Sequence, residues 1–190
     1  MTHVFNPQNF RKLDNPERRR LLPAKELLKD FGLRTGHIIV DIGAGAGYFA
    51  LPAKSIVGPK GKVIAVDGSD EMLAMLRKRA QARNKTIQII NAKASATKLP
   101  NGFADMVLMA FVLHEVDKKR TVLHEARRLL KPGGTLAVVE WQKKVTRQGP
   151  PRSDRISSGE ARVLMESEGF KAVAAGKINA VHYAAVGIKV

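Results

Sequence analysis

The stretch that most constrains this chain is 38–47, IIVDIGAGAG, in which an apolar run leads into Asp41 and then into alternating glycines. The β-forming side chains before the acid predict a buried strand. Glycine at Gly43, Gly45 and Gly47 predicts a sharp turn where a ligand can approach the backbone closely, followed by a helix. A buried strand that turns through glycines into a helix is typical of a nucleotide site.

The acid distinguishes this turn from a dinucleotide site. The usual dinucleotide fingerprint has a third glycine where this chain has Tyr48, and it lacks the acid at Asp41. A carboxylate at this point would repel a pyrophosphate, so a dehydrogenase is a distant alternative. The spacing D-x-G-x-G-x-G resembles motif I of the class I S-adenosylmethionine-dependent methyltransferases. The resemblance implies that Asp41 holds the cationic methionyl end of that cofactor, directly or through water.

Length and composition indicate one domain with a sizeable core, since the chain has 190 residues and 44% of them are hydrophobic. We expect an N-terminal helical preface or lid over 1–35 and one binding domain over 36–190. No apolar run approaches the roughly 18 residues of a membrane span, and no secretory signal is evident, so we expect a cytoplasmic protein. The absence of cysteine excludes disulfides, thiolate metal sites and cysteine-dependent methylation. The sequence predicts no metal site.

The net charge is the strongest anomaly of the composition, because 33 lysines and arginines against 17 aspartates and glutamates give +16. An anionic partner such as RNA or an acidic membrane surface would explain this excess. Basic side chains scattered over solvated helix faces would also explain it, and that is the more usual meaning of charge runs.

The pattern of apolar and turn residues predicts alternating strands and helices. The expected strands cover 38–41, 62–66, 86–90, 105–111, 135–140, 172–174 and 182–189. The expected helices begin near positions 16, 23, 46, 70, 117 and 158, with caps at Asn15, Ser69 and Ser157.

A second acid, Asp67, follows the strand expected at 62–66 and lies 20 residues beyond Gly47. An acid at the end of this strand can accept hydrogen bonds from both ribose hydroxyls of a nucleotide. Asp41, the three glycines and Asp67 together form a specific signal. In the methyltransferase interpretation, further cofactor contacts come from Ala44, Gly68, Met72 and Phe111. Met72 would lie against the adenine, although core packing explains it as well.

The loop after the third expected strand departs from the family pattern. In related methyltransferases this loop carries an acid that recognises the adenine amino group, but here no acid occurs between Asn91 and Asn101. We expect Asn91 or Ser95 to contact the adenine edge, helped by backbone N–H groups from Ala92 onward.

His114 and Glu115 follow the strand expected at 105–111, at the edge where open α/β sheets bind ligands. If a methyl acceptor must lose a proton, His114 is the expected base, with Glu115 or Glu140 as alternatives. His114 could instead cap the next helix. The run LHEVDKKRTVLHEARRLLKPGGTLAVVE resembles the same family, especially its small metabolite branch and the ubiquinone and menaquinone C-methyltransferases.

Candidate acceptor contacts lie in segments expected to border that edge. They are Lys12 in the preface, Glu140 and Trp141 at the end of the strand expected at 135–140, and Arg152 in the polar loop that follows. The preface would close over the site, or it would merely cover an edge of the sheet.

The resemblance covers nearly the whole chain and implies an α/β fold with a doubly wound, mainly parallel, seven-stranded sheet, helices on both faces and an antiparallel last strand. It implies an enzyme that transfers a methyl group from S-adenosylmethionine to a small molecule by in-line displacement and leaves S-adenosylhomocysteine. Two alternatives stay open: an RNA or protein methyltransferase, and a regulatory protein that binds the cofactor but has lost catalysis. The sequence allows either a monomer or a homodimer.

Overall fold

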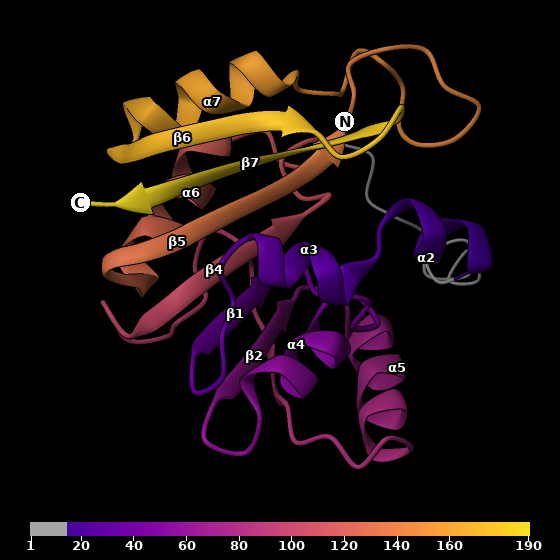
Figure 1. Cartoon of the computed structure of the whole chain (residues 1–190), viewed down its shortest axis with the longest axis vertical. Coiled ribbons are helices and arrows are strands. Elements are labelled where there is room, and N and C mark those ends of the chain that lie inside the picture. The colour runs from indigo at the N-terminus through magenta and orange to yellow at the C-terminus, as the bar shows by residue number, and fades with distance from the viewer. Residues whose placement is uncertain (1–14) are drawn as a thin grey trace.

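The computed structural model describes residues 15–190, apart from the side chain of Ala172, and contains one seven-stranded sheet with helices on both faces (Figure 1). The strands are β1 (Ile38–Ile42), β2 (Lys62–Asp67), β3 (Gln88–Asn91), β4 (Ala104–Ala110), β5 (Leu130–Trp141), β6 (Phe170–Lys177) and β7 (His182–Lys189). The helices are α2 (Pro16–Leu21), α3 (Ala24–Asp30), α4 (Ala50–Val57), α5 (Asp70–Gln81), α6 (Lys119–Leu129) and α7 (Ser158–Ser167).

The strand order across the sheet is β3-β2-β1-β4-β5-β7-β6. Strands β1 to β5 pair in parallel, and β7 runs antiparallel to both β5 and β6, so the predicted antiparallel last strand is confirmed. From β1 the chain builds the sheet outward through β2 and β3, then returns to place β4 on the other side of β1. Ligands of such sheets bind beyond the carboxyl ends of strands at this reversal.

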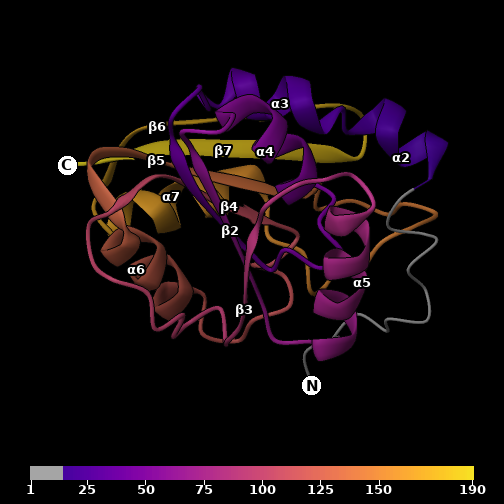
Figure 2. The same cartoon turned by 90° about the horizontal axis from the view of Figure 1, so that it is seen from below.

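Strand side chains alternate between two cores, because successive residues of a strand point to opposite faces. Ile39 and Leu108 belong to a core with residues of α3, α4 and α5, whereas Val40 and Val107 belong to a core with residues of α6 and α7. Figure 2 shows α3 and α4 on one side of the sheet and α6 and α7 on the other. The sheet is therefore covered by helices on both faces.

The helix after the glycine turn begins later than predicted, at Ala50 rather than near Ala46. Gly43, Gly45 and Gly47 have φ values of 72°, 51° and 82°, which lie in the left-handed region. A right-handed helix needs negative φ at each position, so it starts only after the last of these glycines.

Three strands differ from their predicted bounds by two residues or more. β5 begins at Leu130 instead of 135, and its pairing with β4 is irregular between Ala104 and Met106. β3 begins two residues later than predicted, and β6 extends well beyond 172–174 because it pairs with most of β7. Strand pairing, which the local sequence does not contain, determines these bounds.

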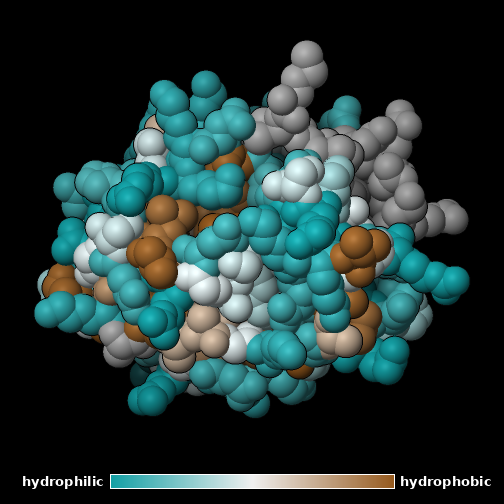
Figure 3. Space-filling view, turned by 90° about the horizontal axis from the view of Figure 1, so that it is seen from above, coloured by the Kyte–Doolittle hydropathy of each residue, from teal (hydrophilic) through white to brown (hydrophobic). Residues whose placement is uncertain are grey.

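The three predicted caps are confirmed. The side chains of Asn15 and Ser69 accept backbone N–H groups of their helices, and Ser157 forms a reciprocal capping box with Glu160. On the face seen in Figure 3, apolar residues form small groups separated by hydrophilic side chains. Within residues 15–190, no helix combines the length and the apolar character needed to cross a bilayer.

Candidate active site

The N–H groups of the three glycines and of Ala44 donate hydrogen bonds to other groups of the protein. Gly43 and Ala44 both donate to the carbonyl oxygen of Val66, at 2.8 and 3.1 Å. Gly45 donates to Oδ2 of Asp67 at 2.8 Å, and Gly47 donates to the carbonyl oxygen of Ala44 at 2.9 Å. A phosphate-binding turn presents such donors to its ligand. This turn is therefore poorly suited to a pyrophosphate.

At two of the three glycines, the missing side chain also makes room for other parts of the protein. A Cβ atom on Gly43 would stand 2.4 Å from Cγ2 of Val112, and one on Gly47 would stand 2.3 Å from Cδ1 of Leu76. Gly45 faces the end of Met72, whose Cε atom would be 3.1 Å from an added Cβ. The glycines let β1 and the turn approach the elements that carry Val112 and Leu76.

Two acids lie at the carboxyl ends of β1 and β2. Asp41 is only 2% exposed, and burial, followed by the charge of Asp67, raises its pKa to about 8 against the opposing hydrogen bond from the N–H of Ala50. Asp67 accepts N–H groups from Gly45 at 2.8 Å and from Ser69 at 2.9 Å. Within residues 15–190, neither acid forms a salt bridge. A ligand with an ammonium group at Asp41 and hydroxyl groups at Asp67 would suit these two acids.

The remaining predicted cofactor residues lie around the ends of β2 and β3. The side-chain amide of Asn91 donates to Oδ1 of Asp70 at 2.6 Å, and the N–H of Ala92 donates to the carbonyl oxygen of Asp67 at 3.1 Å. Gly68 is exposed, Ser95 is partly exposed, and Met72 is buried. The loop itself has no acid, but the fold brings Asp70 to it from α5. Sequence reasoning did not single out Asp70, because only the fold brings the start of α5 next to Asn91.

The predicted base is part of a buried pair. Nδ1 of His114 lies 2.8 Å from Oε2 of Glu140, and the side chains are 7% and 1% exposed. Burial would lower the pKa of His114, but the hydrogen bond and charge of Glu140 outweigh it and raise that pKa above its usual value. Glu140 also accepts the N–H groups of His114 and Trp141, each at 3.3 Å. With Nδ1–H donated to Glu140, Nε2 is the ring atom that can take a proton from a substrate.

Glu115 stands on the other side of the same imidazole. Its Oε1 atom lies 3.9 Å from Nε2 of His114, and its side chain is 32% exposed. Burial, followed by the charges of Glu140 and Asp67 against that of His114, raises the pKa of Glu115 to about 7. At neutral pH this group exists in both protonation states, so it can exchange protons with solvent.

Aromatic rings gather beside this pair. The ring centroids of Phe111 and Trp141 are 5.6 Å apart, and that of His182 lies 5.4 Å from the first and 4.5 Å from the second. The guanidinium of Arg18, on α2, lies over the rings of Phe111 and Tyr48 at 4.9 and 4.7 Å. Sequence reasoning predicted site roles for Phe111 and Trp141 but missed Tyr48 and His182, because only the tertiary fold brings them to this place.

The four predicted acceptor contacts lie in different surroundings. Trp141 lies at the site edge and is partly exposed. The side chain of Glu140 is 1% exposed and lies behind His114, with its Oε2 atom 2.8 Å from Nδ1 of that ring. Arg152 is exposed in the loop after β5 and forms no ion pair with another described residue. Lys12 lies outside the described residues.

Arg155, in the same loop, is only 4% exposed, and its side chain holds the loop together. It donates to the carbonyl oxygens of four loop residues and to the hydroxyl of Thr146. Its guanidinium also lies 5.3 Å from the centroid of Trp141. Figure 1 shows α2 and this loop at the edge where β4 and β5 end.

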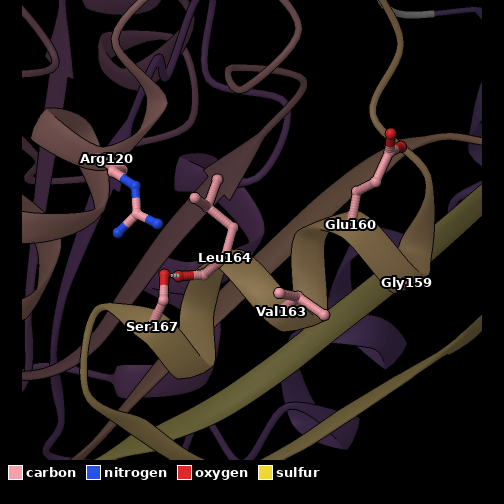
Figure 4. A pocket seen from close by; sticks show the side chains of 6 residues that line it. All are labelled: Arg120, Gly159, Glu160, Val163, Leu164 and Ser167. Carbon is pink, nitrogen blue, oxygen red and sulfur yellow. Dashed lines mark hydrogen bonds between the residues drawn. The ribbon is translucent and has the colours of Figure 1, made fainter.

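Two surface cavities lie away from these residues. One, of about 430 Å³, lies between α7 and the start of α6, where Arg120 faces Leu164 and Ser167 (Figure 4). The other, of about 320 Å³, is lined by Asn101, Gly102, His124, Arg127, Arg128 and Lys189. Neither contains a residue of the predicted site.

Comparison with known proteins identifies relatives that are methyltransferases. A family model described as "Methyltransferase domain" matches residues 40–138, which is more than half of the chain. The chain is 34% identical over 116 residues to the ubiquinone/menaquinone biosynthesis C-methyltransferase UbiE of Pasteurella multocida, covering 60% of this chain and 43% of that protein. The homologous protein of Ectopseudomonas mendocina is 37% identical over 114 residues, covering 59% and 44%. The chain thus spans less than half the length of these relatives.

A solved structure matches almost the entire chain. The crystal structure of a SAM dependent methyltransferase from Aquifex aeolicus has a TM-score of 0.92 and 30% sequence identity, covering 98% of this chain and 100% of that one. The similarity therefore includes the helices before β1 as well as the sheet.

Proposed function

The chain belongs to the S-adenosylmethionine-dependent methyltransferases, and from this premise we propose that it transfers the cofactor's methyl group to a small-molecule acceptor. The observation that carries the proposal is the pair Asp41 and Asp67 beside a turn whose N–H groups are already used. Within residues 15–190 neither acid has a cationic partner, so the two suit a ligand that brings an ammonium and a pair of ribose hydroxyls. The two carboxylates and the bonded N–H groups of the turn are unfavourable for a pyrophosphate.

In the proposed site, each end of the cofactor has its own residues. Asp41 takes the methionyl ammonium, with Gly43, Ala44, Gly45 and Gly47 forming the wall of the turn. Asp67 and Gly68 lie at the ribose. Met72, Asn91, Ala92 and Ser95 lie around the adenine, and Asp70 joins them because it accepts the amide of Asn91.

Bound S-adenosylmethionine supplies an electrophilic methyl group on a sulfonium. The protein's main contribution is then to hold the acceptor in line with that methyl group, and such positioning can be worth roughly 7–11 kcal/mol. We propose that Nε2 of His114 removes the acceptor's proton, while Glu140 fixes the ring through Nδ1 and stabilises the imidazolium that forms. Glu115 then passes the proton between His114 and solvent.

Support for a small acceptor comes from the relatives and from the site itself. The names of the curated relatives assign them C-methylation in ubiquinone and menaquinone biosynthesis. In this chain, His114 and Glu140 are buried, which suits a small molecule better than a polymer. A cytoplasmic location stays a prediction, as does the role of 1–35 as a lid, for which the position of Arg18 over Phe111 is the support.

The test is a transfer assay with S-adenosylmethionine labelled in its methyl group. The protein is incubated separately with small-molecule extract, bulk RNA and a protein fraction. We expect label in the small-molecule fraction and its loss with His114→Ala. Tight cofactor binding without transfer to any fraction would instead favour a regulatory protein that binds the cofactor.

RNA methylation is the second candidate, and the +16 charge favours it. The cavity lined by Arg127, Arg128 and Lys189 adds a local concentration of cations. Against it, Arg128 is paired with Glu125, and Lys189 donates to the carbonyl oxygen of Leu130. Label in the RNA fraction, together with a gel shift that weakens steeply with salt, would establish this alternative.

A further inference from the structure

The loop between β3 and β4 carries residues proposed for the adenine, although it contains no acid. It begins with a tight turn, which is closed by the N–H of Ala96 donating to the carbonyl oxygen of Lys93 at 3.0 Å. Ala94 and Ser95 form the middle of this turn and are partly exposed. Within residues 15–190, their N–H groups donate to no other group. The turn therefore has two backbone donors available for a ligand.

The turn is fixed at both ends. Before it, the N–H of Ala92 donates to the carbonyl oxygen of Asp67, the proposed ribose residue, at 3.1 Å. After it comes Thr97, the one buried residue of the stretch 92–101. The N–H and the hydroxyl of Thr97 both donate to Oε1 of Glu125, on α6, at 2.8 and 2.6 Å. The second end of the turn is thus held by a side chain of α6.

Arg128, one helical turn after Glu125, completes this support. Its Nε and Nη2 atoms donate to the two carboxylate oxygens of Glu125, at 2.7 and 2.8 Å. Its Nη1 atom donates to the carbonyl oxygen of Leu99 at 2.7 Å and to the side-chain oxygen of Asn101. Burial would raise the pKa of Glu125, but the hydrogen bonds from Arg128 and Thr97 outweigh it and lower that pKa to about 2. The acid is therefore ionised at physiological pH.

An ion pair three residues apart on a helix commonly supports only the helix itself. The pair of Glu125 and Arg128 also bonds to the loop, because the carboxylate accepts both donors of Thr97 and the guanidinium reaches Leu99. A different ion pair of α6 shows the contrast: Arg120 lies 2.7 Å from Glu168, which joins α6 to the end of α7 instead. The bonds of the first pair therefore act on the β3–β4 loop as well as on the helix.

We propose that Glu125 and Arg128 are positioning residues for the adenine end of the cofactor site. Acting through Thr97, they set the place of the turn, whose free N–H groups donate to N1 of the bound adenine. N1 of adenine accepts a hydrogen bond, whereas N1 of hypoxanthine carries a hydrogen. A correctly placed donor therefore favours adenine over hypoxanthine. This inference deepens the proposed function and rests on it.

The test compares two ligands that differ only in the base: S-adenosylhomocysteine and S-inosylhomocysteine, which carries hypoxanthine. Calorimetric titration gives the dissociation constant of each ligand, and the ratio of the two constants measures base selectivity. We expect the unmodified protein to bind S-adenosylhomocysteine roughly tenfold or more tightly. A change that acts on the whole fold should weaken both ligands alike, whereas a change that moves the turn should alter the ratio.

Glu125→Gln is the first variant. Each carboxylate oxygen accepts at least one N–H group, so the NH₂ group of the amide would face a donor in either orientation. We expect the ratio to fall to about threefold or less, mainly because S-adenosylhomocysteine binds more weakly. Thr97→Val keeps the branched shape but loses the hydroxyl, so it should also lower the ratio. Thr97→Ser keeps the hydroxyl and should retain the ratio.

Arg120→Gln is the matched control, because it breaks an ion pair of the same helix that does not reach the loop. It should leave the ratio unchanged. Urea unfolding of each variant gives its stability, so that a loss of selectivity can be compared with the loss of stability.

The inference is overturned if the unmodified protein binds the two ligands equally, or if Thr97→Val or a folded Glu125→Gln protein keeps the ratio. A loss of equal size for both ligands would show that the pair supports the fold alone. Thr97→Val decides the matter if Glu125→Gln fails to fold. Failure of the unmodified protein to bind either ligand would count against the proposed function instead.

Discussion

Nδ1 of His114 and Oε2 of Glu140 are 2.8 Å apart in a site where neither side chain is more than 7% exposed. The two residues come from the ends of neighbouring strands, β4 and β5. Because the carboxylate takes Nδ1–H, the opposite nitrogen is left to act as a base. The arrangement pairs the proposed base, His114, with the carboxylate that orients its ring, Glu140.

Substitution of Glu140 by Gln should slow methyl transfer by about 10- to 100-fold, because it removes the charge that orients His114 and stabilises its protonated form. Burial of His114 alone would lower its pKa, and Glu140 reverses that effect. As a base, His114 must be neutral, so activity should rise with pH through its raised pKa. In Glu140→Gln this rise should occur at lower pH. The rate of label transfer as a function of pH measures it, with exposed Glu166→Gln as the control.

Asp41 should destabilise the ligand-free protein increasingly as pH rises. Its pKa is about 8 in the fold against an ordinary value of 3.8, so between these values the unfolded chain releases a proton that the folded protein retains. Stability contributed by this group is therefore lost as pH rises from about 4 to about 8. Relative to the unmodified protein, Asp41→Asn should be more stable at pH 7.5 than at pH 4.5 by roughly 4 kcal/mol, because each pH unit between the two pKa values costs about 1.4 kcal/mol. Urea unfolding at both values tests this, and an equal difference at the two pH values would contradict it.

Gly47→Ala should destabilise more than Gly133→Ala. Both glycines have positive φ, at 82° and 76°, so both substitutions strain the backbone by a similar amount. Only the first adds a collision, since its Cβ would lie 2.3 Å from Leu76, whereas nothing lies within 4 Å at Gly133. The extra cost of overpacking should be about 1–3 kcal/mol in urea unfolding. Equal losses would show that Leu76 adjusts without cost.

Phe111 should reveal backbone strain at the end of β4, because its φ of 65° is unfavourable for a residue with a side chain. Phe111→Gly and Phe111→Ala both remove the ring, but glycine also relieves the strain. We expect the Gly variant to be the more stable by about 0.5–1 kcal/mol, the reverse of their usual order within a strand. Urea unfolding of the two variants side by side gives the comparison.

The sequence predicts the parts of this site that are local in the chain. Asp41, the glycines and Asp67 sit at strand ends that apolar runs mark clearly, so their positions and the sheet of seven strands could be predicted. The close approach of Leu76 to Gly47 could not be predicted, since Leu76 belongs to another helix, α5.

Residues that meet only through the tertiary fold escaped prediction. His182 reads as an ordinary first residue of a strand, and only the pairing of β7 with β5 sets it beside Trp141. The contact between Arg18 and Phe111 also depends on the tertiary fold, because the packing of α2 brings that guanidinium over the ring. Glu140 could be predicted at the site, but its burial behind His114 could not.

The central claim is that Asp41 and the glycine turn bind S-adenosylmethionine through its ammonium, and calorimetric titration with S-adenosylhomocysteine tests it most directly. We expect one site per chain, with affinity that increases from pH 6.5 to pH 7.5 as Asp41 gives up its proton. Asp41→Asn should weaken binding by roughly tenfold or more and remove the pH dependence. Unchanged affinity in Asp41→Asn, or NADH binding in place of S-adenosylhomocysteine, would contradict the claim.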